Sequence, residues 1–417
     1  MKVLVVGGGG REHAICLALK KSGRITKLYC APGNGGIAEI AECVDISATD
    51  IEAMPRFARE NGIDFVMVAP DDPLALGMVD AMEAVGIRAF GPYKNAAVIE
   101  SSKVFSKNLM AKYSIPTAKY EVFTDPGKAI DYIRKQGAPI VVKADGLALG
   151  KGVVVAADIK TAEEAVLSMM RDNKFGDSGA RIVIEECMTG PEVTVLAFTD
   201  GKTVKPMLSS QDHKRAFDND IGPNTGGMGA FCPSPKYTPE IAEICMNTIF
   251  RPTIDAMRSE GRPFKGVIYF GLMLTPDGPR VVEYNARFGD PEAQAVLLML
   301  KTDLLDIFDA VIDERLAEID IKWHGGYSCC VVMASGGYPE KYDKGLEITG
   351  LERVPVDITV FHAGTKKSGE RLFTNGGRVL GVTALGVSLP DAAGRAYEGV
   401  RIIHFDDAHF RTDIGKK

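Results

Sequence analysis

Residues 140–155 read IVVKADGLALGKGVVV, and this stretch decides which fold the chain is expected to adopt. Two apolar runs of β-strand character flank a basic, glycine-rich loop. The loop is not a Walker A motif, because only three residues separate Gly146 from Gly150 and because Gly152 follows Lys151. A strand–loop–strand unit of this kind can fold over a triphosphate as a lid. The alternative is an ordinary glycine-rich hairpin, which the lysines of the stretch make the weaker interpretation.

A second polar stretch, RVVEYNARFGD, spans residues 280–290. Alternate side chains of a strand share a face, so Glu283, Asn285 and Arg287 are predicted to lie together. Carboxylate and carboxamide oxygens suit Mg²⁺, which takes its other ligands from waters and substrate phosphates, and an arginine beside them can hold a carboxylate or a phosphate. The alternative, a solvated polar face, is disfavoured because the preceding GVIYFGLML is apolar on both faces. The opposite face is predicted to carry Val282, Tyr284 and Ala286.

The first hundred residues alternate short apolar runs with amphipathic segments of helix length, which is typical of a parallel sheet covered by helices. Ligands bind such sheets at the carboxyl ends of the strands, where three turn clusters lie. The predicted strands are 2–6, 27–30, 64–69 and 87–90, the predicted helices are 12–21 and 74–85, and the turn clusters are GGGGREH (7–13), APGNGG (31–36) and APDDP (69–73).

The glycines at 7–10 lie between a predicted strand and a predicted helix, where a phosphate can approach backbone N–H groups. The dinucleotide fingerprint G-x-G-x-x-G is not met, because its third glycine position holds Glu12 or His13. No acidic residue follows the second strand either. A phosphate-binding turn and a purely structural turn therefore both remain open at this point.

Two further segments concentrate polar chemistry. VIEECMTGPEV at 183–193 is predicted as a strand ending in two glutamates, which can bind ribose hydroxyls while the backbone reads an adenine edge. Taken alone, a surface cluster is the simpler interpretation. The segment 209–231 is long, polar and without periodicity, which indicates a functional or disordered loop. Its His213 gains weight only from this position, since a lone histidine is more often structural than catalytic.

The composition narrows the class of protein. The chain has 417 residues, 49 basic and 55 acidic, and its net charge of −6 argues against binding to a nucleic-acid backbone. Its longest apolar runs are far shorter than the roughly 20 residues that span a bilayer. The eight cysteines form no C-x-x-C pair and are predicted to be mostly buried, reduced thiols. These features predict a cytoplasmic protein of two to four domains, whose 45 glycines require a local explanation.

Taken together, the motifs resemble those of the ATP-grasp superfamily, and within it the glycinamide ribonucleotide synthetase family. The matching stretches follow the family's order over essentially the whole chain. They are GGREHA (9–14), APGN (31–34), PIVVKADGLALGKGV (139–153), SQDHKR (210–215), GPNTGGMGA (222–230), RFGDPE (287–292), HAGT (362–365) and TNGGRVL (374–380).

This resemblance implies a multidomain protein of α/β and α+β class. Residues 1–101 would form an N-terminal parallel α/β (pre-ATP-grasp) domain that binds phosphoribosylamine, residues 102–318 an ATP-grasp core with a lid subdomain at about 120–187, and residues 319–417 a mixed α+β domain. The implied reaction joins glycine to 5-phosphoribosylamine, driven by ATP through glycyl phosphate, in purine biosynthesis. The expected cofactors are ATP and Mg²⁺ or Mn²⁺. The expected partners are these small molecules, with no nucleic acid or membrane, in a monomer or weak homodimer.

The resemblance also implies roles for individual residues. ATP would be bound by Lys103, Lys143, Gly150, Lys151, Gly152, Glu185, Glu186, Cys187, Met188 and Glu192. Glu283 and Asn285 would bind the metal ion, and Arg287 with Asp212, His213 and Lys214 would act on glycine and the acyl phosphate. The substrate side facing the phosphoribosyl group would comprise Gly8, Gly9, Gly10, Asn34, Asp71, Gly289 and Asp290.

Three positions depart from the family's pattern. Gly8 stands where the family usually has Asn, Ala69-Pro70-Asp71 replaces GPE, and Ala286 replaces a cysteine. The first two leave the ribosylamine contacts open. Three other interpretations also remain: a different ATP-grasp ligase such as a carboxylase or an enzyme acting on an aminoimidazole, an oxidoreductase binding a nicotinamide cofactor at 7–10, and a non-enzymatic regulatory binder, which would not need a metal strand.

Overall fold

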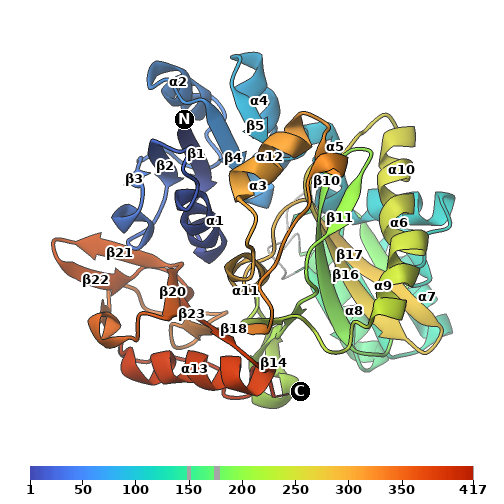
Figure 1. Ribbon diagram of the computed structural model, residues 1–417. Helices are drawn as coiled ribbons and strands as arrows, with labels where there is room; N and C mark the ends of the chain where they lie inside the picture. The colour runs from blue at the N-terminus through green and yellow to red at the C-terminus, as the bar shows by residue number, and fades with distance from the viewer. Residues whose placement is uncertain (148–151, 173–178, 417) are drawn as a thin grey trace.

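The N-terminal region is built on a five-stranded parallel sheet in the order β3-β2-β1-β4-β5, as the computed structural model shows (Figure 1). The structure describes residues 1–147, 152–172 and 179–416. The strands are β1 (Lys2–Gly7), β2 (Lys27–Pro32), β3 (Glu42–Cys43), β4 (Phe65–Val68) and β5 (Arg88–Phe90), and the helices are α1 (Gly10–Lys20), α2 (Ala53–Glu60), α3 (Asp71–Leu76), α4 (Met78–Ala84) and α5 (Lys94–Ser101). The four strands predicted from the sequence and their parallel pairing are confirmed.

One predicted helix of this region is wrong. The sequence predicted a single helix over 74–85, whereas α3 and α4 lie on either side of Gly77. Gly77 has a φ of 97°, a left-handed conformation that ends α3 and that glycine adopts without the clash of a Cβ. Because α3 begins directly after β4, Asp71 lies in the first turn of a helix at the carboxyl edge of the sheet.

The central region contains two antiparallel sheets, in the orders β6-β9-β7-β8 and β11-β10-β16-β17. Their strands are β6 (Tyr120–Phe123), β7 (Ile140–Ala144), β8 (Val153–Ala156), β9 (Ile182–Glu186), β10 (Glu192–Asp200), β11 (Val204–Pro206), β16 (Lys265–Thr275) and β17 (Gly278–Asn285). The helices are α6 (Lys103–Lys112), α7 (Pro126–Gln136), α8 (Ile159–Met170), α9 (Pro239–Cys245) and α10 (Arg251–Ser259). The antiparallel pairing of β7 with β8 confirms the predicted strand–loop–strand unit.

A third antiparallel sheet (the third sheet) has the strand order β12-β15-β18-β23-β20 and joins two distant parts of the chain. The segment 209–231 was predicted as an irregular loop, and this is wrong, because it supplies two strands to this sheet and a separate hairpin. The elements are β12 (Gln211–Asp212), β13 (Arg215–Phe217), β14 (Ile221–Asn224), β15 (Gly229–Cys232), β18 (Tyr327–Ala334), β20 (Ile358–His362), β23 (Arg378–Gly386) and α13 (Leu389–Ile402), with a smaller sheet of β19 (Glu347–Ile348), β21 (Thr365–Ser368) and β22 (Arg371–Thr374).

Two helices, α11 (Glu292–Leu298) and α12 (Leu304–Ile312), connect the regions. Figure 1 shows α11 at the centre, and six of its seven residues are buried. On α12, the Phe308 ring stacks on Phe90 of β5 with 3.9 Å between centroids, while Asp309 pairs with both Arg24 and Arg88. The N-terminal sheet is thus attached to α12 by apolar and ionic contacts. In the part of the chain that the structure describes, no helix is long and apolar enough to cross a membrane.

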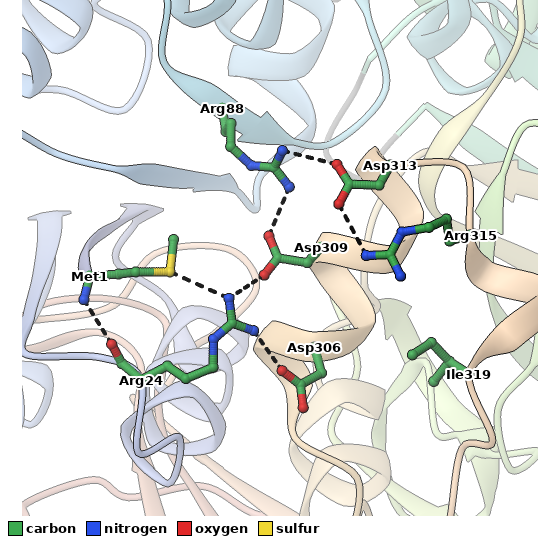
Figure 2. A pocket seen from close by; sticks show the side chains of 8 residues that line it. All are labelled: Met1, Arg24, Arg88, Asp306, Asp309, Asp313, Arg315 and Ile319. Atoms are coloured by element: carbon green, nitrogen blue, oxygen red, sulfur yellow. Dashed lines mark hydrogen bonds and ion pairs between the residues drawn. The ribbon is translucent and has the colours of Figure 1, made fainter.

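A pocket of about 580 Å³ lies at this contact between the N-terminal region and α12, and Figure 2 shows the side chains that line it. Each arginine that lines it has a carboxylate partner: Arg24 and Arg88 pair with α12, and Arg315 pairs with Asp313 at 3.3 Å. Its charges therefore compensate one another. None of the lining residues belongs to the predicted site, so the pocket marks a contact between two regions rather than the candidate functional site.

A pair of histidines joins the N-terminal region to the third sheet. Nδ1 of His13 in α1 accepts a hydrogen bond of 2.8 Å from the backbone N–H of His362 in β20, and both side chains are buried. Burial, together with the neighbouring His362, lowers the pKa of His13 to about 3. Burial also lowers the pKa of His362 to about 4. Both rings are therefore neutral at physiological pH, and His13 serves as a hydrogen-bond acceptor.

This pair predicts acid sensitivity. Between pH 6.5 and about 4 the unfolded chain binds protons at both positions that the folded chain does not, so the free energy of unfolding should fall as the pH falls, by up to ~1.4 kcal/mol per pH unit for each histidine. His13→Asn keeps an acceptor and removes one titrating group, and it should therefore show a shallower pH dependence in urea unfolding. The exposed His404→Asn is the control and should keep the wild-type slope. An unchanged slope in His13→Asn would contradict the assignment.

Candidate functional site

A buried carboxylate with two ammonium groups lies where β7 and β9 meet α6. Oε2 of Glu185 lies 3.0 Å from Nζ of Lys143 and 3.1 Å from Nζ of Lys107, and the three side chains are at most 5% exposed. Burial lowers the pKa of Lys107 to about 8. Oε1 of Glu185 is buried and has no hydrogen-bond partner among the described residues. Two cations thus share one carboxylate, which leaves an excess of positive charge that suits an anionic ligand.

Lys103 lies at the first turn of α6, beside the start of the glycine-rich loop. Its Nζ donates to the carbonyl of Gly146 at 2.9 Å. The adjacent Asp145 carboxylate accepts from Ser102 Oγ at 3.0 Å and from the guanidinium of Arg181 at 2.6 Å, which anchors the loop to α6. Burial, and to a smaller extent Lys143, lowers the pKa of Lys103. The two lysines predicted to hold ATP phosphates are thus electrostatic neighbours.

Of the three loop residues predicted to bind ATP, Gly150, Lys151 and Gly152, the structure describes only Gly152. Gly150 and Lys151 lie outside the described residues. The carbonyl of Gly152 accepts from the backbone N–H of Ala144 at 2.8 Å and so closes the hairpin between β7 and β8. Gly152 therefore ties the returning strand to the lysine-bearing strand.

The carboxylate of Glu186, the last residue of β9, is occupied by contacts within the protein. The carboxylate of Glu186 already accepts from Arg280 at 3.1 Å and from a backbone N–H. Cys187 and Met188 are half-buried and follow the strand without regular structure, and Glu192 begins β10 at an exposed position. This placement is compatible with the predicted nucleoside contacts, which remain predictions.

A register shift in β17 sets the direction of the predicted metal ligands. The pairing with β16 slips by one residue next to Val282, so Val281, Tyr284 and Ala286 all pack into the same apolar core. The prediction that Val282 shares a face with Tyr284 is therefore wrong, because the bulge breaks the alternation. Val282 instead offers its carbonyl to Nζ of Lys143 at 3.0 Å.

Glu283 and Asn285 face the cationic side of this strand. Oε1 of Glu283 lies 3.5 Å from Nζ of Lys214. Burial alone would raise the pKa of Glu283, but Lys214 and Lys143 outweigh this effect and hold it below its ordinary value. Oδ1 of Asn285 accepts from Arg287 at 3.2 Å. The described chain holds no group of three His, Cys, Asp or Glu side chains placed to bind a metal unaided. One carboxylate and one amide oxygen fit Mg²⁺ that completes its shell with phosphates and water.

Arg287 connects β17 to the N-terminal region. Its guanidinium pairs with Glu100 of α5 at 3.1 Å, and the other oxygen of Glu100 accepts from the backbone N–H of Ala286 at 2.7 Å. Burial raises the pKa of Glu100 to about 7. Burial alone would raise the pKa of Asp71. Arg287 and Arg11 outweigh this effect and hold the pKa of Asp71 below its ordinary value. Nε of Arg287 is buried and has no partner within the described chain, so one donor is left for a ligand.

The SQDHKR motif divides its side chains between two environments. Asp212 is near Glu292 of α11, and burial followed by this second carboxylate raises the pKa of Asp212. Lys214 forms ion pairs with Glu192 and Glu283 at 3.1 and 3.5 Å. His213 lies in a separate environment, with its ring 5.8 Å from that of Phe231, and burial lowers its pKa to about 4. The structure thus brings Asp212 and Lys214 to the site and leaves His213 outside it.

The N-terminal glycine turn is held from the side by Asn34. A Cβ built on Gly8 would lie 2.5 Å from the carbonyl oxygen of Gly33, so a larger residue would require the backbone at Gly33 to shift. The amide of Asn34 donates to the carbonyls of Gly8 and His362 at 3.0 and 2.7 Å, and its Oδ1 accepts two backbone N–H groups. Because all four hydrogen-bonding positions of this side chain are occupied, Asn34 shapes the turn that the substrate was predicted to meet.

Asp290 lies beside this turn and connects it to the third sheet. Its carboxylate accepts from Gln294 at 2.8 Å and pairs with Arg378 at 3.1 Å. Burial alone would raise the pKa of Asp290. Arg378 and Arg11 outweigh this effect and hold the pKa of Asp290 below its ordinary value. A Cβ on Gly9 would come within 3.5 Å of this carboxylate. The turn, the RFGD loop and the C-terminal region therefore meet at one carboxylate.

Five charged residues of the cluster were assigned no role from the sequence, although the spacing or the quoted motifs pointed to four of them. Lys107 follows Lys103 by four residues and so lies on the same helix face. Glu292 and Arg378 stand inside the quoted RFGDPE and TNGGRVL motifs, and Arg11 stands inside GGREHA. Nothing in the sequence indicates which residue pairs with Glu100, because its partner Arg287 lies far along the chain.

Comparisons with known proteins identify the class. Profiles of the phosphoribosylglycinamide synthetase N domain, ATP-grasp (A) domain and C domain match residues 1–100, 101–293 and 328–417. The chain is therefore a three-domain protein of ATP-grasp class, which confirms the multidomain fold predicted from the sequence. It belongs to the phosphoribosylglycinamide synthetase family.

Individual relatives agree with this assignment. The phosphoribosylamine–glycine ligases of Caldanaerobacter subterraneus subsp. tengcongensis and Halalkalibacterium halodurans are 46% and 48% identical, covering 99% and 100% of this chain and 99% and 97% of their own. The crystal structure of phosphoribosylamine–glycine ligase from Thermotoga maritima has a TM-score of 0.84 at 30% identity and covers 99% of this chain and 100% of that chain. A biotin carboxylase domain from Hydrogenobacter thermophilus, with a TM-score of 0.76 at 15% identity over 98% of this chain and 91% of its own, shares the fold.

Replacing Lys107 tests the shared carboxylate. In Lys107→Met, Lys143 becomes the sole cation on Glu185 and is held back from an incoming phosphate, so we expect the KM for ATP to rise about tenfold, the equivalent of ~1.4 kcal/mol. Steady-state kinetics over a range of ATP concentrations measure the effect. The control Lys112→Met changes an exposed lysine of the same helix and should leave the KM unchanged. A folded Lys107→Met protein with wild-type ATP affinity would refute this role.

Proposed function

We propose that this protein joins glycine to 5-phosphoribosylamine, with conversion of ATP to ADP and phosphate, to give glycinamide ribonucleotide in purine biosynthesis. The observation that carries the proposal is the full-length match to phosphoribosylamine–glycine ligases, which covers the glycine turn, the lysine cluster and the polar strand together. An oxidoreductase finds no support, since the matched family is a ligase family. A carboxylase is supported only by similarity of fold.

The lysine cluster supports a triphosphate at the ends of β7 and α6. Lys103 and Lys143 would neutralise the phosphates, while Glu185 to Met188 and Glu192 would bind the nucleoside. We propose Glu283 and Asn285 as the ligands of Mg²⁺ or Mn²⁺, which would neutralise charge on the transferred phosphoryl group. Phosphoryl transfer depends mainly on positioning and charge neutralisation, and both are supplied by these rigid strands.

The amino-acid side of the site lies next to this strand. Arg287 would bind the glycine carboxylate, since it keeps a buried donor without a partner among the described residues. Asp212 interacts electrostatically with Glu292 and Arg378. We propose that its carboxylate binds the ammonium group of glycine. The glycine turn at 7–10, with Asp71 and Asp290, would face the phosphoribosyl group. We propose the domain limits 1–101, 102–318 and 319–417, with the lid at about 120–187.

The chemistry follows in two steps. An oxygen of the glycine carboxylate attacks the γ-phosphorus and displaces ADP, which forms glycyl phosphate. The amine of phosphoribosylamine then attacks the acyl carbon, and phosphate leaves with the carboxylate oxygen while the amine loses a proton. Arg287, held by Glu100, would keep the carboxylate in place during the first step.

Oxygen labelling tests this sequence of bonds. With glycine labelled with ¹⁸O in its carboxylate, and phosphoribosylamine formed in the assay from ribose 5-phosphate and ammonia, each phosphate released should contain one labelled oxygen. Mass spectrometry of the phosphate measures it. ADP formation without glycine at the full rate would exclude the ligase function, whereas glycine-dependent turnover with unlabelled phosphate would exclude only the acyl phosphate.

The metal assignment predicts the effect of neutralising Glu283. Glu283→Gln keeps the shape of the side chain but removes a negative ligand, so we expect kcat to fall about 100-fold, or ~2.7 kcal/mol in the barrier. A higher requirement for Mg²⁺ should accompany the loss. The control Glu164→Gln alters an exposed residue of α8 and should have full activity. Wild-type kcat and Mg²⁺ dependence in Glu283→Gln would remove this residue from the metal site.

A further inference from the structure

Arg378, from the TNGGRVL motif of the C-terminal region, contacts two loops of the candidate site at once. It is the first residue of β23. One guanidinium nitrogen donates to the carbonyls of Gly226 and Asp290, both at 2.7 Å, and the other pairs with the Asp290 carboxylate at 3.1 Å. Only a planar group with several N–H donors can make these contacts together. Arg378 thus fastens the turn at 225–228 to the RFGD loop.

Tyr338 holds the same turn from a second direction. Its hydroxyl oxygen accepts the backbone N–H of Gly226 at 3.0 Å. The ring packs against Gly377, where a Cβ would collide with it, so the glycine of the motif makes room for the tyrosine. Two side chains of the C-terminal region therefore bind the N–H and the C=O of one residue, Gly226, and define where this turn lies.

The position of the turn decides the position of Asp212. Gly227 has a φ of 110°, and a Cβ built on it would lie 2.6 Å from Oδ1 of Asp212. The turn is also hydrogen-bonded to the SQDHKR segment, because the backbone N–H groups of Thr225 and Met228 donate to the carbonyls of Lys214 and His213 at 2.7 and 2.8 Å. The Asp212 carboxylate is therefore enclosed by the turn that Arg378 and Tyr338 hold.

We propose that Arg378 and Tyr338 are positioning residues that dock the 225–228 turn on the RFGD loop and thereby place Asp212 for the amino-acid substrate. They act through Gly226 and Asp290 and not by contact with the reacting atoms. The C-terminal region thus contributes to amino-acid binding from outside the ATP-grasp sheets. This inference rests on the proposed function for the identity of the amino acid, glycine.

For Tyr338→Phe the expected loss is in position more than in stability, whereas Arg378→Gln also leaves the Asp290 carboxylate without its cationic partner. Gly226 is exposed, so water can replace the hydrogen bonds to its N–H and C=O when the side chains are removed. The turn then gains freedom, and the carboxylate beneath it is no longer fixed relative to Arg287. Binding of glycine should weaken selectively, whereas the lysine cluster that faces the triphosphate is held by β7, β9 and α6 and should be unaffected.

Four variants test the proposal. Arg378→Gln should raise the KM for glycine at least tenfold and Tyr338→Phe, which removes one hydroxyl, about threefold, with the KM for ATP changed by less than twofold. Arg378→Lys keeps the charge but cannot make all the contacts, and it should fall between Arg378→Gln and the wild type. The matched control Arg371→Gln changes an exposed arginine of β22 that pairs with Glu347, and its KM for glycine should equal that of the wild type.

Hydrogen exchange supplies a readout that is independent of turnover. Backbone amides of 225–228 should exchange faster in Arg378→Gln and Tyr338→Phe, and amides of β7 should not. Faster exchange with an unchanged KM for glycine would overturn the proposal, as would equal losses for glycine and ATP together with a lower Tm. If Arg378→Gln does not fold, Tyr338→Phe decides. If the wild type shows no glycine-dependent ADP formation, the proposed function fails, while exchange at 225–228 still tests the docking.

Discussion

The ion pair between Arg287 and Glu100, 3.1 Å long, ties the polar strand of the central region to α5 of the N-terminal region. A buried charge must meet an opposite charge within the fold, or it destabilises the fold by several kcal/mol. The pair therefore constrains both regions: α5 must present Glu100 where β17 ends. The same requirement recurs at Asp290, whose partner Arg378 comes from the C-terminal region. The candidate site thus exists only when all three regions are assembled.

Glycine accounts for how close these regions come. At Gly8 and Gly227 the neighbouring atoms, the Gly33 carbonyl and the Asp212 carboxylate, occupy the space that a Cβ would need. Polar backbone can therefore approach charged groups directly, and the loops need no side chains to fill the contact. Many of the 45 glycines lie in such loops around the cluster, in a chain whose net charge is negative. Part of the surplus that the composition left unexplained thus serves close approach to charged groups, as at Gly9, Gly227 and Gly289, whereas a Cβ on glycines such as Gly23 and Gly86 would meet no atom within 4 Å beyond the adjacent residues.

Local patterns could be predicted from the sequence, and long-range pairing could not. The parallel strands of the N-terminal region follow from periodicity within each segment, and the β7–β8 unit follows from adjacent apolar runs. β15 escaped prediction because its partner β18 lies about a hundred residues away, and β12 escaped prediction because among the described strands it pairs only with β15. Spacing correctly grouped Glu283 with Asn285 but missed the bulge at Val282, since a register shift depends on the opposing strand. His213 was grouped with its neighbours, although its ring lies against that of Phe231, a contact that spacing within the motif does not indicate.

The charges that remain after pairing explain why the site suits two kinds of substrate group. Around Glu185 the lysines outnumber the carboxylate, so an anion such as a triphosphate lowers the electrostatic energy there. Around Asp212 a second carboxylate, Glu292, is present: burial and then Glu292 raise the pKa of Asp212, while Lys214 and Arg378 oppose this rise. In the proposed function, the ammonium group of glycine would relieve the repulsion between these carboxylates, while Arg287 would bind its carboxylate. In the proposed function, the glycine zwitterion would lie between the two environments in one orientation, with its carboxylate turned toward the phosphates.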